Sequence, residues 1–223
     1  MVGVFLVILC DIGNSTFNFF DTKKRRSKKI FLDQKLLKKY KDKTIYFISV
    51  NKSATKKLKK YYNNCIDINS MFEFNTKYKG MGIDRQVACV LYDHSIIIDC
   101  GSAITVDVMK NGKHKGGYIM PGLKAYEDSF KAISPKLDYG FNKDVDISIL
   151  PQNTQDAISY SIKQNIVLSI KDIRKKYKDL NCIITGGDGE TVQKYIKNSV
   201  YKKHLLFDSM KEIIDAYNST AKG

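Results

Sequence analysis

Short apolar runs alternate along this chain with amphipathic segments rich in lysine. The runs predict buried strands at 3–11, 16–21, 44–50, 65–68, 95–98, 182–185 and near 204–207. The segments between them predict helices at 32–40, 54–62, 86–92, 123–133, 155–177 and 209–217, and one helix that ends at Lys197. A basic stretch, 22–29, is predicted to be an exposed loop. This alternation predicts an α/β fold whose strands are at least partly parallel.

One pattern occurs twice. Residues 95–107 read as a buried strand, an aspartate, a Gly-Ser turn and a second strand, and residues 4–16 repeat this order. The two copies lie about 90 residues apart, at Asp11-Ile-Gly13 and Asp99-Cys-Gly101. The repeat therefore predicts two similar lobes.

The chemistry of this repeat favours phosphate binding. A glycine turn brings backbone N–H groups close to an anion, and the Ser, Thr and Asn side chains that follow add hydrogen-bond donors. The aspartate cannot bind phosphate directly, but it can bind the cation that accompanies a nucleotide. A single Asp-x-Gly also occurs in ordinary hairpins, so the doubling carries the inference.

A loop at 72–82 leads into the sequence Gly82-Ile83-Asp84-Arg85. Asp84 would stand at a helix start, where the helix dipole stabilises a carboxylate by about 0.3–1 kcal/mol. The residues alone leave two readings, a functional carboxylate or a capping aspartate beside an arginine, and they favour the second.

Composition describes an ordinary globular protein of 223 residues with 43% hydrophobic and 27% charged residues. The net charge of +15 raises the question of a nucleic-acid partner, but the lysines are spread along the chain and their densest runs lack interleaved aromatics. We therefore expect no nucleic-acid partner. No run approaches the length of a membrane span, and the apolar N-terminus lacks the basic start of a signal peptide.

Cysteine and histidine usage agrees with a cytoplasmic protein. The five cysteines form no C-x-x-C pair and lie mostly in apolar runs, as expected of buried thiols in a reducing compartment. The three histidines share no metal-ligand spacing, which disfavours zinc. The turn at 185–189 is not G-x-G-x-x-G, and a P-loop sequence is absent, so Rossmann and P-loop sites are disfavoured.

Taken together, these motifs resemble the type III pantothenate kinases, small members of the acetate kinase, sugar kinase, Hsp70 and actin superfamily. The matching pieces occur in the family's order and cover most of the chain: 11–16, 82–85, 99–107, 116–122, 153–154 and 185–189. The resemblance implies two ribonuclease H-like (actin-like ATPase) lobes, at 1–93 and 94–223, with a nucleotide cleft between them. It also implies ATP-dependent phosphorylation of pantothenate to 4'-phosphopantothenate, the first step of coenzyme A biosynthesis, by a homodimer.

The resemblance also implies site residues. Those that would hold the ATP phosphates are Asp11, which would lie near Mg²⁺, Ile12, Gly13, Asn14, Ser15, Thr16, Phe17, Asn18 and Ser102. Asp99 would bind a monovalent cation, K⁺ or NH₄⁺. Those that would bind pantothenate are Tyr78, Gly82, Ile83, Asp84 and Arg85, together with Thr154 from across a dimer interface. Asp84 would be the general base.

The chain departs from the family pattern at several positions. Ser15 stands where threonine is usual and keeps the hydroxyl group, while Ser102 likewise replaces a threonine. Asn75 occupies the position of a common aromatic residue, and Tyr78 is its nearest substitute. A glycine that the family has in the helix after Asn153-Thr154 is replaced here, near Ser161.

Two alternatives stay open from the sequence. Another kinase of the superfamily would share the ATP motifs, but such kinases are usually longer and lack this G-x-D-R sequence. A non-catalytic transcriptional accessory protein of the same fold would suit the positive charge. The three carboxylates of Asp11, Asp84 and Asp99 disfavour it, because a binding protein has no need of them.

Overall fold

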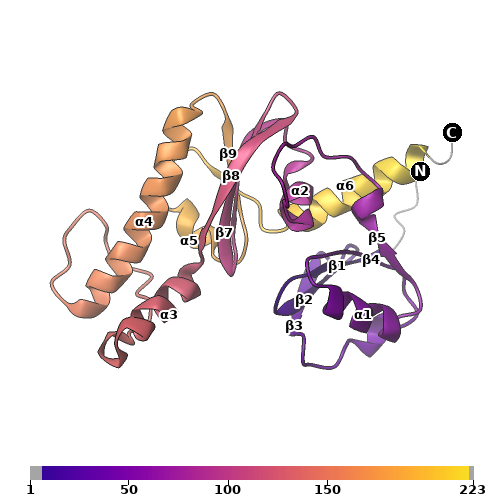
Figure 1. Ribbon diagram of the computed structural model, residues 1–223, viewed down its shortest axis with the longest axis horizontal. Coiled ribbons are helices and arrows are strands. Elements are labelled where there is room, and N and C mark those ends of the chain that lie inside the picture. Colours follow the sequence, from indigo (N-terminus) through magenta and orange to yellow (C-terminus); the bar gives the residue numbers. More distant parts are fainter. Residues whose placement is uncertain (1–6, 221–223) are drawn as a thin grey trace. The chain divides into compact units, whose positions relative to one another are not determined.

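A computed structural model of the chain describes residues 7–220 (Figure 1). The described residues divide into two compact units: 7–74, 79–91 and 206–220 form the N-terminal unit, and 75–78 and 92–205 form the C-terminal unit. Each unit contains one five-stranded sheet.

The N-terminal sheet has the order β3-β2-β1-β4-β5. Its strands are β1 (Ile8–Ile12), β2 (Thr16–Asp21), β3 (Arg26–Phe31), β4 (Ile45–Ser49) and β5 (Cys65–Asp67). β1 pairs antiparallel with β2 and parallel with β4, while β3 continues the antiparallel side and β5 the parallel side. The expected first strand began at residue 3, and its first residues, 3–6, lie outside the described part of the chain.

Both faces of this sheet are covered because β1 is apolar on both sides. Ile8, Cys10 and Ile12 pack with α1 (Lys52–Tyr61), whose Ala54 and Leu58 are buried. Leu9 faces the opposite side, in a cluster with residues of α2 (Ile83–Cys89) and α6 (Leu205–Thr220). The sheet is therefore enclosed between helices, as expected of strands that read as continuous apolar runs.

The C-terminal sheet has the order β10-β9-β6-β7-β8. Its strands are β6 (His94–Cys100), β7 (Ala103–Lys110), β8 (Lys113–Pro121), β9 (Asn181–Thr185) and β10 (Val200–Tyr201). The helices α3 (Leu123–Ile133), α4 (Thr154–Lys176) and α5 (Gly189–Gln193) pack on one face of this sheet (Figure 1).

The two sheets have the same topology. In each, the first three strands form an antiparallel meander, the fourth strand pairs parallel with the first, and the fifth pairs parallel with the fourth. The predicted pair of similar lobes is therefore confirmed.

Three predicted elements are wrong. The stretch 22–29 is not all loop, because β3 begins at Arg26. The first four residues of β3 are polar and exposed, and only Ile30 is buried, so no alternation marks the strand. The expected helix at 32–40 is only a 3-10 turn, Lys38–Tyr40. The expected strand near 204–207 is the first turn of α6.

The two units also differ from a division into 1–93 and 94–223. The second segment of the N-terminal unit ends at Leu91, and the C-terminal helix α6 also belongs to this unit. The helix packs there because Phe207 stacks on Phe20, with ring centroids 4.7 Å apart, and Met210 is buried in the same cluster. Conversely, residues 75–78 belong to the C-terminal unit.

Candidate functional site

The first Asp-x-Gly sequence forms the tight turn between β1 and β2. Gly13 N donates to the Thr16 carbonyl oxygen at 3.0 Å, and the Asn14 and Ser15 side chains are exposed at the tip. Asp11 is half-buried and faces Asn18 across the antiparallel pair. The turn thus presents backbone and polar side chains to solvent.

Two of the expected phosphate-binding residues anchor this turn. Ile12 and Phe17 are opposite each other in the β1–β2 register, and both are fully buried in the core under α1. Their side chains are therefore committed to packing, and only their backbone groups could face a ligand.

The pocket of the N-terminal unit lies where the parallel strands β4 and β5 end. It has a volume of about 380 Å³ and is lined by Ser49, Val50, Asp67, Asn69, Met81, Gly82, Ile83 and Gln86. Ser49 is paired with Ile12, and Val50 N donates to the Ile12 carbonyl oxygen at 3.1 Å. The pocket and the β1–β2 turn are therefore neighbours.

Six of these lining residues were missed by sequence reasoning: Ser49, Val50, Asp67, Asn69, Met81 and Gln86. The order of the parallel strands, once known, points to two of them, because ligands in sheets of this kind bind beyond the carboxyl ends of parallel strands. Ser49 and Asp67 are the last residues of such strands.

Asp84 stands in the first turn of α2, which begins three residues earlier than expected. Its Oδ1 accepts the Arg85 backbone N–H at 2.9 Å. Gly82, at the N-cap, has no side chain between this carboxylate and Val50, whose Cγ1 lies 3.8 Å from where a Gly82 Cβ would stand. Arg85 is 6% exposed. The helix start, with Gly82 and Ile83, thus forms one wall of the pocket.

The second Asp-x-Gly sequence forms the turn between β6 and β7. Gly101 N donates to the Ala103 carbonyl oxygen at 3.0 Å, and the Ser102 side chain is exposed. Gly122 N donates to the Ser102 carbonyl oxygen at 3.2 Å, and a Cβ on Gly122 would clash with this backbone. The turn is therefore held by the start of α3.

Asp99 of β6 lies beside Gly186, which belongs to the turn that follows β9. Gly186 has a φ of +89°, and a Cβ there would overlap both Asp99 Oδ1 and the Cys100 carbonyl oxygen. Two oxygen atoms thus lie close to the position that a side chain on Gly186 would take. Burial, and then the charge of Asp99, raise the pKa of the Cys100 thiol, which keeps it neutral.

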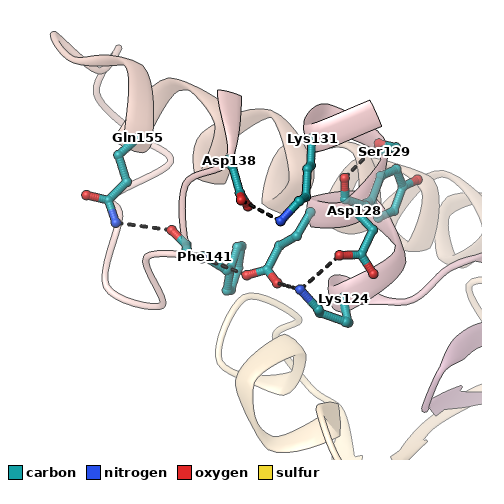
Figure 2. A network of polar contacts seen from close by, with 10 residues as sticks. Lys124, Asp128, Ser129, Lys131, Asp138, Phe141 and Gln155 are labelled. Atoms are coloured by element: carbon teal, nitrogen blue, oxygen red, sulfur yellow. Dashed lines mark hydrogen bonds and ion pairs between the residues drawn. The ribbon is translucent and has the colours of Figure 1, made fainter. Parts of the chain in front are cut away.

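Thr154 is the first residue of α4, directly after its N-cap, and its side chain is exposed. The loop before it is fixed to α3 and α4: Phe141 N donates to Glu127 Oε1 at 2.6 Å, and Gln155 Nε2 donates to the Gly140 carbonyl oxygen at 3.1 Å (Figure 2). Ser161, near the family's glycine position, donates its hydroxyl hydrogen to the Ile158 carbonyl oxygen.

Lys163 of α4 holds the same loop. It is 3% exposed, and its Nζ donates to the Lys143 and Val145 carbonyl oxygens at 2.5 and 2.9 Å and to Tyr195 Oη at 2.7 Å. The loop before Thr154 is therefore held in place by specific hydrogen bonds, although its sequence has no clear periodicity.

Tyr78 belongs to the C-terminal unit. Its backbone N–H donates to Thr76 Oγ1 at 3.0 Å, and its ring centroid lies 6.0 Å from that of His114. The N-terminal unit thus contains the 11–18 and 82–85 residues, and the C-terminal unit contains Tyr78, Asp99, Ser102 and Thr154.

Within residues 7–220, side chains of histidine, cysteine, aspartate and glutamate form no group of three or more that could hold a metal ion. Over the same residues, no helix combines the length and apolar character needed to cross a bilayer.

Comparison with known proteins decides the family. The model of the type III pantothenate kinase family matches residues 7–176. The chain belongs to the type III pantothenate kinases. The type III pantothenate kinase of Helicobacter hepaticus is 40% identical over 209 residues, which are 94% of this chain and 98% of the relative. That of Campylobacter jejuni serotype O:2 is 41% identical over 208 residues, 93% and 96% of the two chains.

Two solved structures share the fold of this chain. A Campylobacter jejuni protein described as a Baf family transcriptional activator superposes with a TM-score of 0.82 at 37% identity, over 95% of this chain and 99% of that chain. The activator of 2-hydroxyisocaproyl-CoA dehydratase from Clostridium difficile, solved with ADPNP, superposes with a TM-score of 0.53 at 13% identity, over 98% of both chains. The second likeness concerns the fold alone, and the predicted ribonuclease H-like lobes are confirmed.

Proposed function

We propose that this kinase transfers the γ-phosphoryl group of ATP to the primary hydroxyl of pantothenate, giving 4'-phosphopantothenate and ADP as the first step of coenzyme A synthesis. Membership in the type III pantothenate kinases supports this reaction. The observation that carries the residue assignment is the position of the Asp84 carboxylate beside Gly82, a residue that lines a pocket next to the β1–β2 turn.

In this proposal Asp84 is the general base. Its carboxylate accepts the proton of the pantothenate hydroxyl while the hydroxyl oxygen forms a bond to the γ-phosphorus, and the bond from that phosphorus to the β–γ bridging oxygen breaks. Phosphoryl transfer depends mostly on positioning, with modest demand for proton acceptance. A carboxylate fixed at a helix start by a backbone hydrogen bond suits that demand.

Residues 11–18 and Ser102 are proposed to bind the ATP phosphates. The Gly13 turn offers backbone N–H groups, and the exposed Asn14, Ser15 and Ser102 side chains offer donors. Asp11 and Asn18 are cross-strand neighbours and would offer carboxylate and amide oxygens to Mg²⁺, which prefers oxygen ligands. When bound, Mg²⁺ neutralises charge on the phosphates.

Asp99 is proposed to bind the monovalent cation, K⁺ or NH₄⁺. The oxygen atoms of Asp99 and of the Cys100 carbonyl that converge beside Gly186 fit a hard cation. The glycine backbone leaves the space that a side chain would fill.

Pantothenate is proposed to contact Gly82, Ile83, Asp84 and Arg85 of the N-terminal unit and Tyr78 of the C-terminal unit. The first two already line the pocket. Arg85 supplies a positive charge for a substrate that carries a carboxylate.

A homodimer, in which Thr154 of one subunit reaches the substrate of the other, completes the proposal. It is supported by large apolar side chains that are exposed on α3, on α4 and on the loop between them: Ile133, Tyr139, Ile149, Leu150 and Leu168. Sedimentation velocity tests it: wild type should sediment as a dimer and Leu150→Glu should shift toward monomer, whereas a monomeric wild type would contradict it.

We place the enzyme in the cytoplasm, where a reducing environment suits its five free cysteines. The substrate is tested by incubating the purified protein with ATP, Mg²⁺ and K⁺ and with pantothenate, acetate or a hexose, followed by mass spectrometry. Phosphopantothenate alone is the expected product. Phosphorylation of acetate or sugar instead would move the enzyme to another branch of the superfamily.

A further inference from the structure

A buried chain of hydrogen bonds joins three side chains at the edge of the C-terminal sheet. His114 Nε2 lies 2.9 Å from Asp107 Oδ1, and His114 Nδ1 lies 2.7 Å from Thr76 Oγ1. The side chains of His114 and Asp107 are 0% and 2% exposed. Neither residue belongs to the ATP or pantothenate sites proposed above. Burying such a pair costs desolvation free energy unless its hydrogen bonds are all made, so the pair calls for an explanation.

The backbone geometry of β7 and β8 allows these hydrogen bonds. The register of β7 and β8 shifts between Val108 and Met109, so that Met109 faces His114 while Val108 faces Gly116. Gly116 has a φ of +122°, which favours glycine over residues with side chains. Bulges of this kind often re-aim a side chain. Here the bulge lies between the two residues of the pair.

The chain of bonds ends on the strap formed by residues 75–78, the short excursion of the polypeptide into the C-terminal unit. His114 N donates to the Asn75 carbonyl oxygen at 3.1 Å, and Thr76 forms a parallel bridge with His114. The Thr76 hydroxyl also accepts the backbone N–H of Tyr78 at 3.0 Å. It can then donate its own proton to Nδ1, in the tautomer whose Nε2–H is donated to Asp107.

We propose that Asp107 and His114 are positioning residues that act through Thr76 to set the conformation of the strap, and with it the place of the Tyr78 ring. The inference rests on the proposed function, in which Tyr78 contacts pantothenate. Three residues separate Tyr78 from Gly82 along the chain, so a fixed strap also fixes one end of the segment that leads to α2. The tyrosine, displaced from the family's aromatic position, is thus supported by a histidine.

The test compares Thr76→Val, which removes the hydroxyl and keeps the branched shape, with Thr76→Ser, which keeps the hydroxyl. Thr44→Val is the matched control, because the Thr44 hydroxyl also forms a side-chain hydrogen bond, which it accepts from Asn64 in the other unit. We expect Thr76→Val to raise the KM for pantothenate about tenfold, the value of one buried hydrogen bond, with kcat and the KM for ATP nearly unchanged. Thr76→Ser and Thr44→Val should keep the wild-type KM.

Hydrogen exchange supplies a second measurement that does not depend on activity. In Thr76→Val and in His114→Phe, the amides of residues 75–78 should exchange faster while those of β6 and β9 stay protected. Unchanged exchange in the strap would overturn the proposal. Faster exchange with an unchanged KM for pantothenate would also overturn it, since the strap would then be held without serving the substrate. A wild-type enzyme that does not phosphorylate pantothenate would instead refute the proposed function. The exchange data would still show whether the hydrogen bonds of Asp107, His114 and Thr76 hold the strap.

Discussion

The Oδ1 atom of Asp84 occupies space that a Cβ atom on Gly82 would need, with a separation of less than 3.0 Å between the two positions. Gly82 has an ordinary extended conformation, with a φ of −60°, so its backbone does not require glycine. What requires glycine is room for the carboxylate, which folds back over residue 82 and accepts the Arg85 N–H.

This relationship predicts the behaviour of Gly82→Ala. The added methyl group should rotate the Asp84 carboxylate out of place, and we expect kcat to fall about 100-fold, the typical cost of misplacing a reacting group by about 1 Å. The fold should tolerate the change, with the free energy of unfolding altered by less than about 1 kcal/mol. Steady-state kinetics and urea unfolding of the same preparation measure both quantities.

Gly140→Ala is the control for this substitution, because a Cβ at residue 140 meets no atom within 4 Å. Its kcat should match wild type. Equal kcat values for Gly82→Ala and wild type would mean that the carboxylate's position does not matter to the reaction.

The cation assignment predicts a change in ion dependence for Asp99→Asn. Loss of the carboxylate charge should raise the K⁺ concentration for half-maximal activity by at least about tenfold, since a charged ligand contributes more than about 1.4 kcal/mol. The measurement is a K⁺ titration at constant ionic strength, with choline as the balancing ion. A K⁺ dependence identical to wild type would remove Asp99 from the cation site.

The hydrogen bonds between Asp156 and the loop before Thr154 should make the stability of the fold depend on pH. Hydrogen bonds from the side chains of Asn142 and then Asn153 lower the pKa of Asp156 below its ordinary value of 3.8. A lowered pKa stabilises the folded state above the ordinary value, and that stability is lost as pH falls through the lowered one. Asp156→Asn should therefore melt at a lower temperature than wild type at pH 7, and the difference should shrink near pH 3. A difference in melting temperature that stays constant between these pH values would contradict this account.

The sequence predicted the elements whose apolar pattern is strong. The buried strands β4 and β6 and the helices α3 and α4 lie within a few residues of their predicted bounds, and the repeated Asp-x-Gly motif correctly indicated two lobes with one topology. β3 was missed because this edge strand begins with four polar, exposed residues and buries only Ile30. The start of α6 was misread because a short apolar run fits a strand and a helix equally well.

The site was only partly predictable for a different reason. Motifs identified residues that lie next to their own glycine turns, such as Asp11, Asp84 and Asp99. The pocket wall contributed by Ser49 and Asp67 carries no motif, and it becomes visible only when the order of parallel strands is known. The Asp107–His114 pair depends on a bulge in β8, and nothing in the residue pattern gave its register.

The most direct test of the proposed mechanism is the kcat for pantothenate phosphorylation of Asp84→Asn beside wild type, in Mg²⁺ and K⁺. The substitution keeps the size of the side chain and removes the proton acceptor, so we predict a decrease of about 10²- to 10⁴-fold. Asp128→Asn, which alters an exposed carboxylate on α3, should retain full activity. A kcat for Asp84→Asn within tenfold of wild type, from a folded protein, would contradict the assignment of Asp84 as the base.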